Sequence, residues 1–198
     1  KGEFLGEIKK SLNKIAKFNY IRKKNSPTIL KKRFLENASK HKIFGVDSIN
    51  DDLLTSVDEK KFNMMLKKSL PKYDVVIVSD YGHGLISKKN AELICKKSQY
   101  LAVNAQVNAA NVGYHSMMNY KNIDCVIINE KELRHELRDK NSKIEELVKK
   151  LSLKYNINNL IITQGNQGAK IYNKKENKLI SSEIYAKTLV DKIGAGDA

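Results

Sequence analysis

Four short apolar runs, each followed by polar or glycine-rich residues, constrain the fold of this chain more than any other feature. They occupy residues 75–78, 101–103, 125–128 and 160–163. Continuous apolar runs of this length are typical of strands that are buried on both faces of a parallel sheet. Helical patterns over about 88–97, from about 130 onward, and over 142–155 separate the runs. Strands that alternate with helices predict an α/β fold with a doubly wound, mostly parallel sheet and flanking helices.

The segments before and after this alternation predict additional elements. Apolar residues recur at helical spacing from Phe4 to Ile15, which indicates an amphipathic helix. Strands are expected over 29–35 and 43–46, followed by a helix that starts near Asp51 and ends before Pro71. Near the C-terminus, segments 169–172 and 179–184 are expected to form a hairpin. A chain of 198 residues without a low-complexity linker fits one domain.

The charge of the chain, +15 at pH 7, invites comparison with nucleic-acid-binding proteins. Most of the basic residues are lysines spread along the whole sequence, and no zinc finger, aromatic RNA motif or basic helix with heptads is present. We therefore expect a solvated basic surface rather than a nucleic-acid partner. Cys95 and Cys125 lie in apolar stretches and are expected to be buried thiols.

Targeting signals are also missing from the printed sequence. No apolar run approaches the roughly 20 residues that cross a bilayer, and the first residues do not resemble a secretory signal. A cytoplasmic protein without membrane contact is therefore expected. The four histidines show no metal-ligand spacing, and His83 is interpreted as a turn residue.

Polar residues and glycines collect directly after each apolar run, in segments 79–84, 104–106, 129–132 and 163–168. Ligands of open α/β sheets bind outside the carboxyl ends of the strands. These four segments therefore predict a binding site by position alone.

The C-terminal sequence Gly194-Ala195-Gly196-Asp197 carries the most specific chemistry. Residues without side-chain bulk let backbone amides approach a phosphate, and a helix that begins there adds the favourable end of its dipole. A carboxylate at Asp197 is then placed to accept a proton from a hydroxyl during phosphoryl transfer. Taken alone, the same residues also suit a helix cap or a turn.

Three motifs together resemble the ribokinase-like (PfkB-type) family of ATP-dependent sugar kinases. Residues 191–197 resemble its C-terminal signature, although Lys192 replaces the usual threonine. Thr163-x-Gly165 with Gly168 resembles its nucleotide-phosphate turn, and Asn129-x-x-Glu132 resembles its magnesium motif. The resemblance implies a ribokinase-like fold with a small β lid over about 28–46 and a nucleotide-binding half over about 74–198.

The resemblance also implies roles for individual residues. Asp197 would be the catalytic base, and the amides of Gly194, Ala195 and Gly196 would form the anion hole for the γ-phosphate. Thr163, Gly165 and Gly168 would contact ATP, while Asn129 and Glu132 would organise Mg²⁺ through waters. Asp191 would help to hold a monovalent cation such as K⁺. The alternative for Glu132 is an ordinary acidic residue in the first turn of a helix.

Within the family, residues 28–33 and 78–84 are similar to segments of the heptose 7-phosphate kinase half of ADP-heptose synthase and of relatives fused to a nucleotidyltransferase. Lys31 and Arg33 lie two apart on a predicted strand, hence on one face, where they would hold a sugar phosphate. The alternative is a lysine-rich edge strand that resists aggregation. Asp80 is expected either to contact the substrate or to cap a turn.

Two segments depart from these heptose kinases. Residues 103–106 stand where the relatives have an Asp-Pro-Lys stretch, and residues 108–120 have no matching segment. We also expect residues 1–198 to form a single partial kinase domain that lacks both ends of the family fold and dimerises through its lid strands. The competing hypotheses are a kinase-like module that binds a sugar or nucleotide without turnover and, further off, a nucleic-acid-binding protein.

Overall fold

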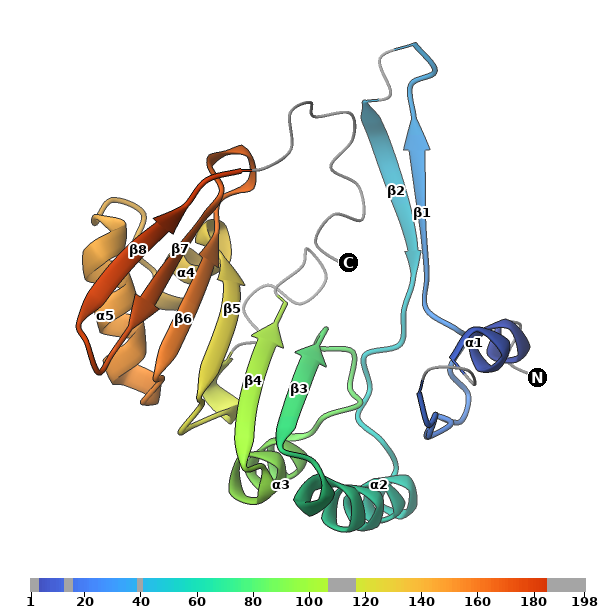
Figure 1. The fold of residues 1–198 in the computed structure, drawn as a ribbon. Helices are drawn as coiled ribbons and strands as arrows, with labels where there is room; N and C mark the ends of the chain where they lie inside the picture. The colour runs from blue at the N-terminus through green and yellow to red at the C-terminus, as the bar shows by residue number, and fades with distance from the viewer. Residues whose placement is uncertain (1–3, 13–15, 39–40, 107–116, 185–198) are drawn as a thin grey trace.

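The computed structural model describes residues 4–12, 16–38, 41–106 and 117–184. Figure 1 shows two regions, a six-stranded sheet with its helices and a separate two-stranded ribbon that stands beyond one edge of the sheet. The sheet contains the strands β3 (Val75–Asp80), β4 (Tyr100–Ala105), β5 (Cys125–Asn129), β6 (Asn159–Thr163), β7 (Ala169–Asn173) and β8 (Lys178–Ser182), in that order.

The first four strands of the sheet run parallel, and the last two are antiparallel to their neighbours. The sheet is therefore mostly parallel, and the predicted α/β class with flanking helices is confirmed. The predicted C-terminal hairpin is also confirmed as β7–β8. Because parallel strands end at the same edge, the polar segments after β3, β4, β5 and β6 gather at one side of the sheet, the upper side in Figure 1.

Connections between sequential parallel strands are right-handed, which places their helices on the same face of the sheet. The connecting helices are α3 (Lys88–Lys97), α4 (Glu130–Leu137) and α5 (Ile144–Tyr155), and α2 (Ser56–Ser69) with the 3₁₀ turn η1 (Leu70–Lys72) precedes β3. On β3, Val78 is buried, whereas Val75 and Ile77 on the opposite face are 53% and 74% exposed. The prediction that this run is buried on both faces is therefore wrong for β3 within the described residues.

Helix α2 begins later than the sequence pattern predicts. Thr55 is its N-cap, and the Thr55 side chain accepts a hydrogen bond from the backbone amide of Asp58 at 3.2 Å. A side chain that satisfies this free amide sets the start of a helix. The predicted start at Asp51 is therefore wrong, and residues 51–54 are left in a loop that lies against the turn after β3.

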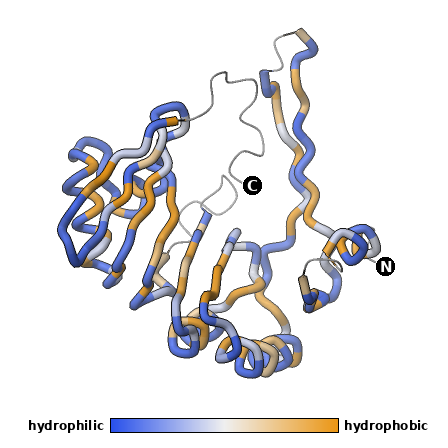
Figure 2. Tube along the Cα trace, in the orientation of Figure 1, coloured by the Kyte–Doolittle hydropathy of each residue, from blue (hydrophilic) through white to orange (hydrophobic). Residues whose placement is uncertain are grey.

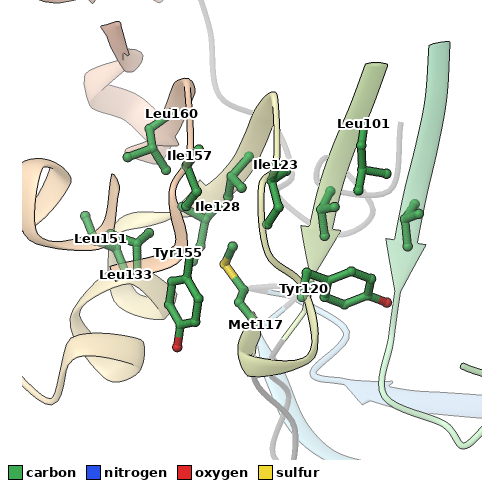
Figure 3. Close-up of a cluster of buried hydrophobic side chains, with 14 of the residues drawn as sticks. Leu101, Met117, Tyr120, Ile123, Ile128, Leu133, Leu151, Tyr155, Ile157 and Leu160 are labelled. Carbon is green, nitrogen blue, oxygen red and sulfur yellow. The ribbon is translucent and has the colours of Figure 1, made fainter. Parts of the chain in front are cut away.

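The hydrophobic core lies between the sheet and helices α3, α4 and α5. Figure 3 shows part of it, in which Leu133 and Leu151 from the helices meet Ile128 and Leu160 from the strands. Figure 2 shows the apolar residues concentrated in β3 to β6, with hydrophilic residues at the carboxyl end of β4. The 3₁₀ turns η2 (Met117–Asn119) and η3 (Gly165–Gln167) complete this region.

The ribbon has no such core. It pairs β1 (Leu30–Leu35) with β2 (Lys42–Ser48) in antiparallel register, after the short helix α1 (Leu5–Leu12). No residue of either strand is buried. The predicted strands over 29–35 and 43–46 and the N-terminal helix are confirmed within these bounds.

Candidate active site

A pocket of about 820 Å³ lies between the ribbon and the carboxyl end of β3. Its size falls in the range of small-molecule sites in proteins, roughly 300–1,000 Å³. Its polar and charged lining comes from four parts of the chain, namely the segment before β1, the strand β1 itself, the loop after β2, and the carboxyl ends of β3 and β4 with the residues that follow them. The residues that supply it are Lys23, Ser26, Lys31, Arg33, Asn50, Ser79, Asp80, Tyr81, His83 and Gln106.

Strand β1 presents different residues to its two sides. Lys31 and Arg33, together with Ile29, line this pocket. Leu30 and Lys32 instead line a second pocket on the side of α1, of about 980 Å³. The period of two along a strand produces this separation. Lys31 and Arg33 therefore share one face of β1, and that face borders the pocket.

The turn after β3 is anchored to the hydrophobic core by hydrogen bonds of Asp80. Asp80 is 6% exposed, and its carboxylate accepts hydrogen bonds from the Tyr120 hydroxyl at 2.7 Å and from the amide of Gly82 at 3.0 Å. Burial, followed by the nearby Asp80 charge, raises the pKa of Tyr120 well above its usual range, so this phenol stays a donor. Figure 3 shows the Tyr120 hydroxyl directed away from Met117. Asp80 lines the pocket, and the bonds named here hold the turn.

The same turn is fastened to the loop between β2 and α2. Gly84 has φ +75°, and a Cβ at this position would lie 2.0 Å from the carbonyl oxygen of Asp52, so only glycine fits. The Nδ1 atom of His83 lies 2.8 Å from Oδ1 of Asp51. Lys23 Nζ donates to the carbonyl oxygen of Asn50 at 2.7 Å. Three segments far apart in the sequence are therefore joined at the pocket.

A second group of predicted residues lies at the carboxyl ends of β5 and β6. The side-chain oxygen of Asn129 accepts a hydrogen bond from the backbone amide of Glu132 at 2.9 Å. In return, the Glu132 carboxylate accepts one from the backbone amide of Asn129 at 3.1 Å. This reciprocal arrangement is a capping box at the start of α4. The structure thus brings Asn129 and Glu132 together, in an arrangement that also serves the helix end.

The predicted nucleotide-phosphate turn lies directly beside this capping box. Thr163 is the register partner of Asn129 in the neighbouring strand. Gly165 and Gly168 both have positive φ, and a Cβ on Gly168 would lie 2.1 Å from the carbonyl oxygen of Ser182. The turn therefore depends on glycine at this position, as the sequence motif implies.

Glu130 links the two motifs. One carboxylate oxygen accepts from the Gln164 side chain at 2.8 Å, and the other accepts from Arg134 Nε and Nη2 at 2.9 and 2.7 Å. The Gln164 hydrogen bond, and after it the Arg134 hydrogen bonds, lower the pKa of Glu130. An ionised Glu130 thus connects the first turn of α4 to the turn after β6.

The Asn129 and Glu132 side chains offer an amide and a carboxylate, which are the oxygen ligands that Mg²⁺ prefers. They lie at the surface, where the ion can keep several of its own waters, so the donor set fits a water-mediated Mg²⁺. No group of three or more His, Cys, Asp or Glu side chains suited to direct metal binding occurs in the described part of the chain.

Several predicted residues lie outside the described residues, namely Asp191, Gly194, Ala195, Gly196 and Asp197. Of the two divergent segments, residues 103–106 are described. There, the Asn104 side chain donates a hydrogen bond to the carbonyl oxygen of Ile127 at 3.0 Å. The backbone amide of Gln106 donates to the carbonyl oxygen of Asp80 at 2.9 Å. From residues 108–120, Met117 and Tyr120 belong to the core.

Sequence reasoning missed Lys23, Asp51 and Tyr120, and it gave no individual role to Glu130 and Gln164 within the predicted segments 129–132 and 163–168. Glu130 and Gln164 had a usable signal, since each follows directly on a motif residue at the end of a parallel strand. The other three come from segments with no recognisable motif.

Residues 17–198 match the family model described as pfkB family carbohydrate kinase. The chain belongs to this family. The predicted family is confirmed, and Lys31, Arg33, Asn129 and Thr163 all lie inside the matched region.

Curated relatives of this pfkB family chain carry the name bifunctional protein HldE. The protein from Aliarcobacter butzleri is 29% identical over 197 residues, which cover 96% of this chain and 40% of that protein. The protein from Blochmanniella pennsylvanica is 26% identical over 197 residues, which cover 96% of this chain and 38% of that protein. The chain thus spans about two fifths of the length of these relatives. Their name agrees with the expected likeness to kinases fused to a second catalytic domain.

Solved structures share the fold of this pfkB family chain. A ribokinase from Giardia lamblia superposes with a TM-score of 0.71 at 20% identity, over 100% of this chain and 61% of that one. A tetrameric inhibited form of phosphofructokinase-2 from Escherichia coli gives 0.69 at 13% identity, over 98% and 62%. The predicted ribokinase-like fold is confirmed. None of the helices in the described ranges combines the length and apolar character needed to cross a membrane.

Proposed function

We propose that this chain carries the ATP-dependent sugar kinase activity of its protein, which transfers the γ-phosphate of ATP to a hydroxyl of a sugar phosphate. The observation that carries the proposal is the pocket between the ribbon and β3, into whose lining β1 supplies both Lys31 and Arg33. Heptose 7-phosphate is the first acceptor to test, because segments 28–33 and 78–84 resemble heptose 7-phosphate kinases.

Lys31 and Arg33 would bind the phosphate that the acceptor already carries. A guanidinium can donate two parallel hydrogen bonds to a phosphate, whereas an ammonium acts as a compact point charge. Lys23 adds a third positive charge to the same pocket. We propose that Asp80 acts mainly by holding the turn after β3, because its carboxylate is buried and bonded to Tyr120 and Gly82.

ATP would bind at the carboxyl ends of β5 and β6, with its phosphates at Thr163, Gly165 and Gly168. Asn129 and Glu132 would hold Mg²⁺ through waters, and the ion would neutralise charge on the phosphates. The hydrogen bond between Glu130 and Gln164 supports a shared site, because it fixes the two motifs relative to each other.

The chemical step would be carried by the C-terminal motif. Asp197 would accept the proton of the acceptor hydroxyl, while the amides of Gly194, Ala195 and Gly196 would stabilise the transferring phosphoryl group. Asp191 would help to hold K⁺. Preorganised donors of this kind stabilise charge that develops only in the transition state.

The test is ADP release from Mg-ATP by the full-length protein and by Asp197→Asn, with heptose 7-phosphate, fructose 6-phosphate, ribose 5-phosphate and the free sugars as acceptors. Acceptor-dependent release that falls by at least about a hundredfold in the variant supports the kinase and its base. Nucleotide binding without release for any acceptor would instead support a module that binds without turnover.

We also propose that the protein is a homodimer that associates through its ribbon. The ribbon exposes Phe34, Phe44 and Val46. The rings of the two phenylalanines stack on each other with their centroids 4.3 Å apart. Exposed apolar residues that gather in this way mark association surfaces. Light scattering after size exclusion tests the proposal, and a monomer at micromolar concentration would overturn it.

A further inference from the structure

The turn after β3 contains a histidine, His83, whose Nε2 atom has no hydrogen-bond partner among the described residues. The side chain of His83 is only 8% exposed, and its Nε2 atom is buried and unpaired. Buried polar atoms in proteins are almost always hydrogen-bonded. An unpaired one raises the free energy of the unliganded protein, and a ligand that supplies the missing partner removes this cost.

The other ring nitrogen is already engaged, and this determines what Nε2 can bind. Nδ1 of His83 lies 2.8 Å from Oδ1 of Asp51. An ionised carboxylate only accepts hydrogen bonds, so Nδ1 carries the hydrogen and donates it. In the neutral ring, Nε2 is then an acceptor. A ligand group that complements it must donate a hydrogen bond, as a hydroxyl does.

The surroundings of His83 select the kind of molecule that brings this hydroxyl. His83 lines the same pocket as Lys23, Lys31 and Arg33, and Lys23 Nζ lies 3.5 Å from the carbonyl oxygen of His83. The carboxylates nearby are Asp80, which is held by Tyr120, and Asp51. The pocket thus combines cations for an anionic group with an imidazole nitrogen for a hydroxyl, and a sugar phosphate has both groups.

We propose that His83 is a substrate-binding residue whose Nε2 atom accepts a hydrogen bond from a sugar hydroxyl, with Asp51 fixing the ring tautomer. The proposal rests on the sugar kinase function proposed above and adds a specificity determinant to it. Nε2 is covered by the chain itself, so the proposed contact forms as residues 81–86 adjust around the ligand. Leu85 and Ile86 of this turn also line the pocket, and Leu85 is 46% exposed.

The experiment compares two ligands that share the phosphate but not the sugar. The full-length protein and its variants are titrated calorimetrically with inorganic phosphate and with whichever of heptose 7-phosphate, fructose 6-phosphate or ribose 5-phosphate gives the fastest ADP release. His83→Leu is expected to bind the sugar phosphate about tenfold more weakly, the loss typical of one hydrogen bond, and inorganic phosphate unchanged. Arg33→Ala is expected to weaken both ligands.

A second variant and a spectrum keep the test independent of folding. His83→Gln retains an acceptor and is expected to bind the sugar phosphate better than His83→Leu. In protein with ¹⁵N-labelled histidine, the Nε2 resonance of His83 is expected to move upfield at saturating sugar phosphate, because its lone pair accepts a hydrogen bond. Inorganic phosphate is expected to leave that resonance in place.

Equal affinity of the wild type and His83→Leu for the sugar phosphate, or an Nε2 resonance that stays in place at saturation, would overturn the role of His83. So would a folded His83→Leu variant that loses both ligands equally, because that pattern belongs to a structural turn residue. A wild type that releases no ADP with any acceptor is a different result, since it removes the proposed kinase function itself.

Discussion

The sheet and the ribbon differ in how much of their apolar surface they bury. The sheet with its helices buries a continuous core that includes Leu147, Leu160 and Tyr120. The ribbon buries no residue of either strand, although it exposes large apolar side chains such as Phe44. Burial of apolar surface is the main favourable contribution to folding. The sheet therefore supplies most of the stability, while the ribbon supplies part of the lining of the pocket.

The largest difference is expected for truncations in the two regions. Leu147 is 0% exposed, and Leu147→Ala should lower the free energy of unfolding by about 2–5 kcal/mol because it leaves a cavity. Val46 in β2 is 53% exposed, and Val46→Ala should change the free energy of unfolding by less than about 0.5 kcal/mol. Urea denaturation measures both. Similar losses would show that the ribbon contributes to the core.

The second prediction concerns the hydrogen bond that joins the core of the sheet region to the turn after β3, which borders the ribbon across the pocket. Tyr120→Phe removes the donor to the buried Asp80 carboxylate and should cost about 1–3 kcal/mol of unfolding free energy. Activity should fall with it, because Asp80 holds the turn that lines the pocket. Tyr73→Phe is the matched control, since Tyr73 is 53% exposed, and it should change neither quantity. An unchanged Tyr120→Phe would mean that core and pocket are independent.

The third prediction concerns the two faces of β1. Arg33→Ala should reduce kcat/KM for the sugar phosphate by about tenfold or more, since a charge-assisted hydrogen bond contributes roughly 1.5–3 kcal/mol. Unfolding should be unaffected. Lys32→Ala removes a positive charge from the same strand but from the side that faces the other pocket, and kinetics should stay near wild type. Equal losses would indicate a general charge effect.

The smallest effect is expected at the link between the nucleotide motifs. Glu130→Ala should raise the KM for ATP by about threefold and leave KM for the sugar phosphate unchanged, since one partly exposed contact contributes under about 1 kcal/mol. Lys131→Ala, one residue further along the exposed side of α4, serves as the control. A matching rise in both KM values would argue against a local effect.

The pH dependence of this link follows from the lowered pKa of Glu130. A depressed carboxylate pKa contributes stability that is present above the ordinary glutamate value, about 4.3, and is lost as the pH falls through the folded-state pKa. Wild type and Glu130→Gln should therefore differ in urea midpoint at neutral pH and converge as the pH falls below the ordinary glutamate value and through the lowered pKa of folded Glu130. A constant difference across this range would contradict the assignment.

Local patterns predicted much of the fold, because they depend on neighbouring residues. Helix α3 has the predicted bounds, and Asn129 meets Glu132 because residues three apart share a helix face. Lys31 and Arg33 share a pocket because strand positions alternate. Pairs of residues that meet only in the tertiary structure could not be predicted from these local patterns. Asp51 and His83 are 32 residues apart, and Asp80 and Tyr120 are 40 apart, so only the folded chain brings each pair together.

The alternation along β1 has a consequence for insertions and deletions. Moving the strand by one position would turn Leu30 and Lys32 toward the pocket beside β3 and carry Lys31 and Arg33 to the side of α1. Moving it by two positions would keep the cationic face in place. The charge that β1 presents to this pocket therefore depends on whether the number of residues between Pro27 and the ribbon changes by an odd or an even amount. Single-residue gaps in this stretch should mark relatives that bind a different acceptor.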